Sequence, residues 1–514
     1  MGRDLKNMLD RSKCTNVPHC ANAAPTVRCN SSSAPTKEMG HDADRHTDEE
    51  KRPELEARSM NNQEKEDDCT DNEDDTHTLD DDDARDEEGQ RADEEVGRAS
   101  TRLSIRRSKS SCRDPGPPPD GGLTAWTQAV MAHLVVFGTW GYISSFGVFQ
   151  TYYVETLGHE PSDISWVGSV QIFLLFFVGT FSGRATDAGY YRHIFVFGTT
   201  LQLLGMFTTS LCTKYWQLFL AQGICTGIGD GLVFCPTIAL LATYFSKNRA
   251  LALGISACGT ATGGMILPVV VQQLLPKIGF GWTVRVIAFI VLGTQMTAFA
   301  FTRTRLPPRK SGAWVEWGAF RELPYALFTL GMFLCFLGLY FAYYYVGSYG
   351  RDIIGVNQSD SITLLLVMNG VGIVTRLLSA FAADHWFGCM NLLIPYAAGC
   401  GLCLYGWSGA HSRGGLFAFA VVYGMVASGM QGLFPATLSS LTTDLKRTGV
   451  RMGMVFSVIS FACLTGAPIG GALVQRGNGH YLYAQMFAGS MLVCGSLILL
   501  AARTAKIGLK LARF

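Results

Sequence analysis

Two ionisable side chains lie deep inside long apolar stretches of this sequence. Asp230 stands between two glycines in GICTGIGDGLVFCPTIALL, and Arg376 stands in MNGVGIVTRLLSAF. A cation in such a stretch costs at least about 2.5 kcal/mol on membrane-insertion scales, so an intramembrane ionisable residue indicates a functional site by default. A guanidinium offers paired N–H donors to an anionic group, and a buried carboxyl group can hold a proton or pair with a cation. We therefore expect Arg376 and Asp230 to form a site for an anionic solute.

Each of these side chains also has a structural interpretation. Arg376 could be bonded to a carboxylate or to carbonyl groups of a neighbouring helix, and Asp230 could be a neutral acid packed among glycines. Two amides in similar stretches, Asn369 and Gln431, are expected to line the same site, although hydrogen bonding between helices explains them equally well. A proton-relay role for His133 is the weaker alternative, because a single histidine is more often satisfied by a neighbour.

The stretches that carry these residues are long enough to cross a membrane. From Trp126 onward, apolar runs of about 17–25 residues alternate with short polar breaks. The sequence therefore predicts an all-α membrane protein with twelve transmembrane helices in two six-helix halves, at 116–302 and 324–502, joined by a linker at 303–323. The predicted spans are 126–149, 164–182, 194–212, 216–241, 250–274, 283–302, 324–347, 361–382, 391–408, 415–441, 451–474 and 483–502.

The two halves repeat one pattern. A helix, a basic break and a second helix, all rich in small residues, run from Gly223 to Pro268, and a similar unit returns about 200 residues later around GMVASGMQGLFPATLSSL. Pro236 and Pro435 occupy matching places in the two copies. Small residues let helices approach closely in a bilayer, and a repeat that keeps its orientation typically has a substrate site between its halves.

Charge divides the chain differently. The first 120 residues hold about 30 of the 41 acids and 19 of the 42 basic residues, with almost no large apolar side chains. Such a segment cannot bury enough surface to fold, so we expect a disordered acidic tail over 1–115 and a short basic tail over 503–514. The cysteines lack zinc-ligand spacing, and neither an ATP-binding Gly-rich loop nor an enzymatic nucleophile arrangement is present. We expect no enzyme, no cofactor, no metal and no nucleic-acid partner.

The distribution of Lys and Arg predicts the orientation. Most of these residues lie on the side that would carry both chain termini, which the positive-inside rule makes cytosolic. No cleavable signal peptide is expected. Nothing in the tail names an organelle, so the plasma membrane is the default location. On the outer side, the sequon at Asn357 is expected to be glycosylated. The basic residues on that side are Lys214, Lys277, Arg285, Arg351, Arg413 and Arg476.

Two motifs resemble a known family. Asp120-Gly121-Gly122-Leu123-Thr124-Ala125-Trp126 resembles the signature that opens the first span of the monocarboxylate porters, a branch of the major facilitator superfamily. Tyr244-Phe245-x-Lys247-x-Arg249-x-Leu251-Ala252-x-Gly254 resembles the second signature of that branch. The resemblance covers about residues 117–502. It implies a transporter fold and an anion-binding arginine at Arg376.

The chain also departs from the branch. Leu123 replaces an aromatic residue, and the first span has no lysine. Gly372 stands one turn before Arg376, where carriers of lactate-like acids have an aspartate. The anion-binding half of that site is kept, and the usual proton-coupling pair is missing.

Two aspartates in loops resemble the loop motif of the wider superfamily. Asp187 follows the second predicted span, and Asp384 follows the eighth. With nearby cations they are expected to form ion pairs on the inner face that hold the helices in one conformation and so gate transport. The expected partners are Arg192, Lys247, Arg249 and Lys446.

The leading hypothesis is therefore a secondary-active transporter that moves a small anionic organic solute by alternating access, with a proton as a candidate coupling ion. The solute would be an organic acid or a fungal secondary metabolite, and efflux is one direction considered. One alternative is a carrier that takes up monocarboxylates or vitamins. Another is a nutrient sensor on the same fold that signals through the acidic tail and transports nothing.

Overall fold

The structure is a computed structural model that describes residues 117–159, 161–307, 315–442, 444 and 447–508. The acidic tail predicted over 1–115 lies outside the described residues, as do residues 509–514 of the predicted basic tail. The described part of the chain is helical throughout and contains no strand. The predicted all-α class is confirmed.

The N-terminal half follows the predicted spans. Its first span is divided at Ser145, and its second at Val178. The elements are α2 (Gly122–Ser144), α3 (Phe146–Leu157), α4 (Pro161–Phe177), α5 (Gly179–Asp187), α6 (Tyr191–Thr209), α7 (Tyr215–Leu218), the π-helical η1 (Phe219–Thr226), α8 (Gly227–Ala242) and α9 (Arg249–Phe301).

The C-terminal half has longer uninterrupted helices. A short 3₁₀ helix in the linker, η2 (Trp317–Arg321), leads into it. The elements are α10 (Leu323–Tyr349), η3 (Gly350–Ile354), α11 (Gln358–Ala382), η4 (Ala383–Phe387), α12 (Cys389–Trp407), α13 (Arg413–Leu441), α14 (Thr448–Arg476) and α15 (Leu482–Ile507).

The number of spanning helices agrees with the prediction. Ten helices among the described residues are long and apolar enough to cross a membrane. One of them, α9, consists of two helices that meet at Gly279, whose φ of 74° interrupts the helical backbone. Splitting α9 there and adding α6, which is as long as α12 but less apolar, gives twelve helices at the predicted spans.

Glycines allow the helices to approach closely. A Cβ atom on Gly141 of α2 would lie 2.7 Å from the Cα atom of Gly263 on α9. Between the halves, a Cβ atom on Gly183 of α5 would collide with the backbone carbonyl of Gly449 on α14. This is the packing that small residues permit between membrane helices.

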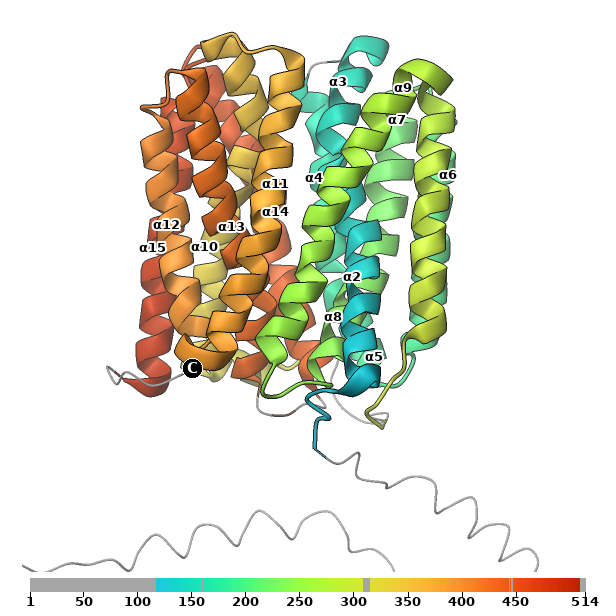
Figure 1. Cartoon of the computed structure of the whole chain (residues 1–514), viewed down its shortest axis with the longest axis vertical. Coiled ribbons are helices and arrows are strands. Elements are labelled where there is room, and N and C mark those ends of the chain that lie inside the picture. The colour runs from blue at the N-terminus through green and yellow to red at the C-terminus, as the bar shows by residue number, and fades with distance from the viewer. Residues whose placement is uncertain (1–116, 160, 308–314, 443, 445–446, 509–514) are drawn as a thin grey trace, which may run out of the picture. The chain divides into compact units, whose positions relative to one another are not determined.

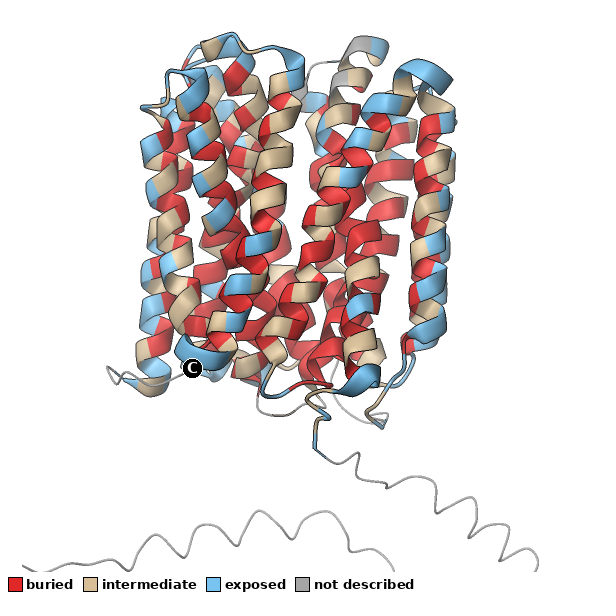
Figure 2. Ribbon diagram, in the orientation of Figure 1, coloured by how far each residue is buried: buried red, intermediate tan, exposed pale blue. Residues whose placement is uncertain are grey.

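We call the end of the bundle where α9 ends and α10 begins the linker end; it is the lower end in Figure 1. Figure 2 shows that buried residues concentrate between the helices, whereas exposed residues lie on outward faces. Large apolar side chains such as Leu204, Phe289 and Leu402 are more than half exposed on these faces. An apolar exterior suits a hydrocarbon surrounding, as expected for a membrane protein.

Candidate functional site

A cavity lies between the two halves. Helices of both halves line it, which is where a protein built from two repeats is expected to hold its substrate. The lining residues are Val136, Trp140, Phe176, Phe234, Ile238, Leu253, Ala257, Thr260, Phe336, Tyr340, Arg376, Gln431, Phe434, Pro435 and Phe456.

Arg376, on α11, brings a cation to this cavity although its side chain is only 1% exposed. Its Nη2 donates to Oε1 of Gln431 over 3.4 Å, and its Nε and Nη1 have no hydrogen-bond partner. No carboxylate among the described residues pairs with it. A buried guanidinium with free donors is costly, so the structure argues against the interpretation in which a neighbouring carboxylate neutralises Arg376.

Other hydrogen-bonding groups surround this guanidinium. Gln431, on α13, donates from Nε2 to the hydroxyl of Tyr343 over 3.5 Å. The buried hydroxyl of Ser428, also on α13, has no partner. A Cβ atom on Gly372 would collide with this hydroxyl and would lie 3.2 Å from Nη1 of Arg376. Gly372 is therefore required by space, and the aspartate of lactate-type carriers does not fit there.

Asn369 lies two turns from Arg376 on α11 and does not line the cavity. Its Nδ2 donates to the carbonyl of Leu365 over 3.0 Å. Its Oδ1 faces Gly264 of α9, where an added Cβ atom would lie 3.2 Å away. Asn369 thus sits at the boundary between the halves, beside the cavity.

Asp230 is placed elsewhere, inside the N-terminal half. It is fully buried on α8, and it is absent from the cavity wall that contains Arg376. Its Oδ2 accepts from Nε2 of Gln171 over 3.1 Å, and its Oδ1 has no partner. Further amides continue this polar cluster, because Gln295 donates to Gln202 over 3.3 Å. The structure does not bring Asp230 and Arg376 together as a pair.

The contacts of His133 agree with the interpretation in which neighbouring groups satisfy its ring. Its Nδ1 lies 2.9 Å from the carbonyl oxygen of Ile255, and its Nε2 lies 3.1 Å from the hydroxyl of Thr262. Both partners belong to α9, so His133 ties α2 to α9.

Aromatic side chains form most of the remaining cavity wall, and none of them was among the predicted site residues. Trp140 of α2 stacks on Tyr340 of α10 across the boundary between the halves, with ring centroids 6.2 Å apart and planes inclined by 16°. Phe234 of α8 stacks on Phe456 of α14 in the same way, with centroids 5.7 Å apart. Phe176 contacts Trp140 at 5.3 Å. In an apolar span, spacing alone does not separate such rings from lipid-facing ones.

The two loop aspartates join the halves at the linker end. Asp187 accepts from the backbone N–H groups of Gly449 and Val450 at the start of α14, over 3.2 and 3.0 Å. Asp384 accepts from those of Ala250 and Leu251 at the start of α9, over 3.0 and 2.7 Å. Each carboxylate therefore caps a helix of the opposite half, where the helix dipole favours negative charge. Among the described residues, Asp384 forms these bonds to backbone N–H groups in place of the expected ion pairs.

Three of the four expected cations have other partners at this end. Arg249 crosses to the other half, since its Nη1 donates to the carbonyl of Ser439 on α13 over 3.3 Å. Arg192 lies over the ring of Phe299, with 6.0 Å from Cζ to the ring centroid. Lys247 is exposed, and its backbone N–H donates to Oδ1 of Asp120 over 2.6 Å. The fourth, Lys446, lies outside the described residues.

The two family-like motifs contact one another. Asp120 also accepts from the backbone N–H of Ser246, and the indole of Trp126 lies 5.0 Å from the ring of Phe245. Asp120 adopts a φ of 51°, which is uncommon for a residue other than glycine. The first motif therefore ties the start of α2 to the loop between α8 and α9.

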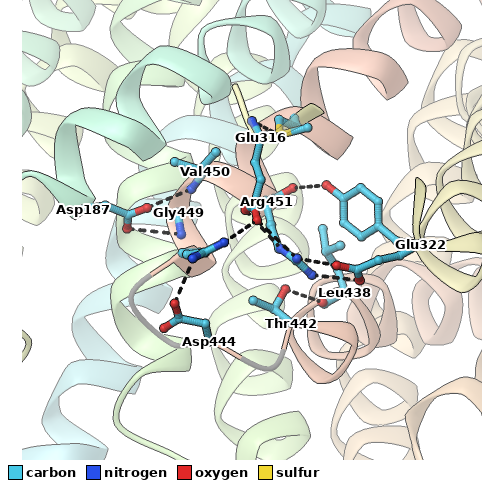
Figure 3. Close-up of polar contacts among 12 residues, drawn as sticks. Asp187, Glu316, Glu322, Leu438, Thr442, Asp444, Gly449, Val450 and Arg451 are labelled. Atoms are coloured by element: carbon cyan, nitrogen blue, oxygen red, sulfur yellow. Dashed lines mark hydrogen bonds and ion pairs between the residues drawn. The ribbon is translucent and has the colours of Figure 1, made fainter. Parts of the chain in front are cut away.

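A cluster of charges fixes the linker to α14 (Figure 3). Glu316 accepts from Nη1 of Arg447 over 2.7 Å and from Nε of Arg451 over 3.3 Å. Arg451 also donates to Glu322, with its shortest bond 2.6 Å long. Partial burial acts to raise the pKa of Glu316, but hydrogen bonds and attraction from Arg451 and Arg447 outweigh it and lower the pKa. The same contact raises the pKa of Arg447. The linker carboxylates were not predicted, because their partners lie more than 100 residues away.

Asn357 lies at the opposite end of the bundle and is exposed. Its Oδ1 accepts from the backbone N–H of Asp360 over 2.8 Å, so it caps α11. This position is accessible, and its glycosylation stays a prediction.

Comparison with known proteins identifies the family. The model of the Major Facilitator Superfamily matches residues 130–450. The chain belongs to this superfamily. An MFS-type transporter of Gibberella zeae is 46% identical over 402 residues, which covers 78% of this chain and 91% of that protein. The Aspyridones efflux protein apdF of Emericella nidulans is 33% identical over 390 residues, which covers 75% of this chain and 79% of that protein.

A solved structure supports the fold of this superfamily member. The crystal structure of the human organic anion transporter MFSD10 is similar with a TM-score of 0.62, and the similarity covers 74% of this chain and 100% of that chain. The two sequences are 12% identical, so this likeness concerns the fold alone.

Proposed function

We propose that this transmembrane transporter carries anionic organic solutes, and that Arg376 binds the anionic group of the solute. The observation that carries this proposal is the guanidinium of Arg376, which is buried at the cavity with two unpartnered N–H positions. An anionic group would satisfy these donors with paired hydrogen bonds. Gln431 would add a donor, and Asn369 would act at the adjacent boundary between the halves.

We further propose efflux of an organic acid or secondary metabolite as the direction of transport. Proteins similar to this chain include the efflux proteins for aspyridones in Emericella nidulans and for fujikurins in Gibberella fujikuroi. The contact between Asp120 and the loop of Ser246 and Lys247 supports membership of the monocarboxylate porter branch, because it joins the two signatures of that branch. Uptake of monocarboxylates or vitamins is the second candidate.

Alternating access would require the linker end to open. In the conformation described here, Asp187 and Asp384 hold the starts of α14 and α9. We propose that these capping bonds and the hydrogen bond from Arg249 to the carbonyl of Ser439 stabilise the state that is closed at the linker end. Breaking them would let the halves separate there, which is the motion expected of two repeats around a central site.

Asp230 would serve as the site of a coupling proton. A fully buried carboxyl group with one unpartnered oxygen and amide neighbours suits this role. We also propose that both termini are cytosolic and that the protein resides in the plasma membrane. The excess of Lys and Arg on the linker side supports that orientation.

Efflux from cells tests the role of Arg376. Cells that express the full chain would be loaded with a panel of labelled organic acids, and release would be compared among wild type, Arg376→Ala and Arg376→Lys. Arg413→Ala is the matched control, because Arg413 forms an exposed ion pair with Asp360. We expect release to be lost in Arg376→Ala and kept in the control. Normal release by a correctly inserted Arg376→Ala protein would refute the proposal.

A further inference from the structure

Strongly polar groups occupy one part of the cavity wall. The N-terminal half contributes eight lining residues, of which only Thr260 carries a polar side-chain group apart from the indole of Trp140. The C-terminal half contributes seven lining residues, namely Arg376, Gln431, Phe336, Tyr340, Phe434, Pro435 and Phe456. A solute held here therefore meets hydrogen-bond donors at Arg376 and Gln431 and a mostly apolar wall from both halves elsewhere.

The apolar wall is largely aromatic. On the N-terminal half, Trp140 contacts Phe176 at 5.3 Å and Phe234 at 5.9 Å between ring centroids. These three rings come from α2, α4 and α8. Aromatic surfaces bind planar unsaturated groups through offset or edge-to-face contacts. A hydrated polar body would leave its hydrogen-bonding groups unsatisfied against this wall.

We infer that the substrates are amphiphilic monoanions, in which one acidic group binds Arg376 and an aromatic or other planar apolar body packs against Trp140, Phe176 and Phe234. This inference rests on the proposed function, and it names the class of anion that the site selects. Trp140 contributes to specificity for the body, because its indole contacts Phe176 and Phe234 of its own half and stacks on Tyr340 of the other half. Small hydrophilic acids would be discriminated against for lack of that contact.

Binding to the purified full-length protein tests this inference. The probes are acetate, 2-naphthylacetate and the neutral 2-naphthylacetamide, and binding is measured by isothermal titration. For wild type we expect 2-naphthylacetate to bind at least about tenfold more tightly than either of the other two probes, a difference of about 1.4 kcal/mol. Trp140→Ala should remove the preference over acetate while keeping the preference over the amide.

Two further variants act as controls. Trp140→Phe keeps an aromatic ring, so it should keep most of the preference even if Trp140→Ala folds poorly. Trp216→Ala removes a tryptophan that is 57% exposed on α7, away from the cavity, and should bind all probes as wild type does. Thermal melting of each variant reports whether it is folded.

The outcomes separate this inference from the proposed function. If acetate and 2-naphthylacetate bind equally and both need Arg376, the inference about the body fails and the anion site stands. If 2-naphthylacetate and its amide bind equally to wild type and to Arg376→Ala, the proposed anion site itself fails. The inference would also be overturned if no aryl acid bound in a panel that runs from benzoate to pyrenebutyrate.

Discussion

Replacing the two capping aspartates should open the linker end. Asp384 accepts two backbone N–H groups at the start of α9. An asparagine side chain at this position would keep one acceptor oxygen and lose the charge. Hydrogen bonds to charged groups contribute about 1.5–3 kcal/mol each, so Asp384→Asn should shift the ratio of open to closed molecules by roughly tenfold to 150-fold.

Asp187 makes the equivalent pair of bonds to α14. Because the two sites share no partner, their effects should add in the double variant, to about 3–6 kcal/mol. Spin labels at His193 on α6 and Trp386 on η4, one on each half and both exposed at the linker end, would report the distance by pulsed electron paramagnetic resonance. The labels would be placed in a background in which reactive native cysteines are replaced by serine.

We expect one short distance for the wild type and a second, longer distance for Asp187→Asn/Asp384→Asn. The control is Asp360→Asn, which alters an ion pair with Arg413 that lies at the opposite end and should leave the linker-end distance unchanged. A double variant with the distance distribution of the wild type would refute the view that these carboxylates hold the halves together.

Three further predictions concern other parts of the molecule. Arg451 and Arg447 lower the pKa of Glu316 in the folded protein. Their ion pairs with Glu316 therefore stabilise the fold fully at pH values above the ordinary carboxyl pKa of about 4.3, and this stabilisation is lost as the pH falls through the lowered pKa. The melting temperature of wild type should therefore exceed that of Glu316→Gln at pH 7 and approach it as the pH falls below the lowered pKa of Glu316; a gap independent of pH would contradict this. Asp120→Ala should lose about 1.5–3 kcal/mol of stability through its bonds to the loop after α8, and unchanged thermal melting would argue against that anchor. Asp230→Asn should keep anion binding but make flux in proteoliposomes insensitive to a pH gradient, whereas an unaltered response to the gradient would exclude Asp230 as the proton site.

The spanning helices could be predicted because each needs a long apolar run, and their number and approximate bounds follow from the sequence. The break in α9 was also visible, since an interval with Pro276, Lys277 and Gly279 separates the two predicted spans. The divisions of the first span at Ser145 and of the second at Val178 could not be predicted, because apolar residues continue on both sides of each. The superfamily was also predicted correctly, from the repeat of six helices and the loop motifs at Asp187 and Asp384.

The site could be predicted only in part. Arg376 and Gln431 stood out because charged and amide groups are rare in apolar spans, and the structure places both at the cavity. Asp230 stood out for the same reason but lies inside one half, since burial in a span says nothing about which side of a helix faces the cavity. Trp140 and Phe456 could not be distinguished from lipid-facing rings. Their roles depend on contacts between helices that lie far apart in the chain.

The most direct test of the central claim compares an acid with its neutral analogue in one transport assay. Proteoliposomes that contain wild type or Arg376→Gln would be preloaded with unlabelled 2-naphthylacetate, and exchange of labelled 2-naphthylacetate and labelled 2-naphthylacetamide would be followed. If the guanidinium of Arg376 binds the anionic group, wild type should exchange the labelled acid faster than the labelled amide. Arg376→Gln should lose that difference in rate. An equal preference for the acid in both proteins would contradict the role assigned to Arg376.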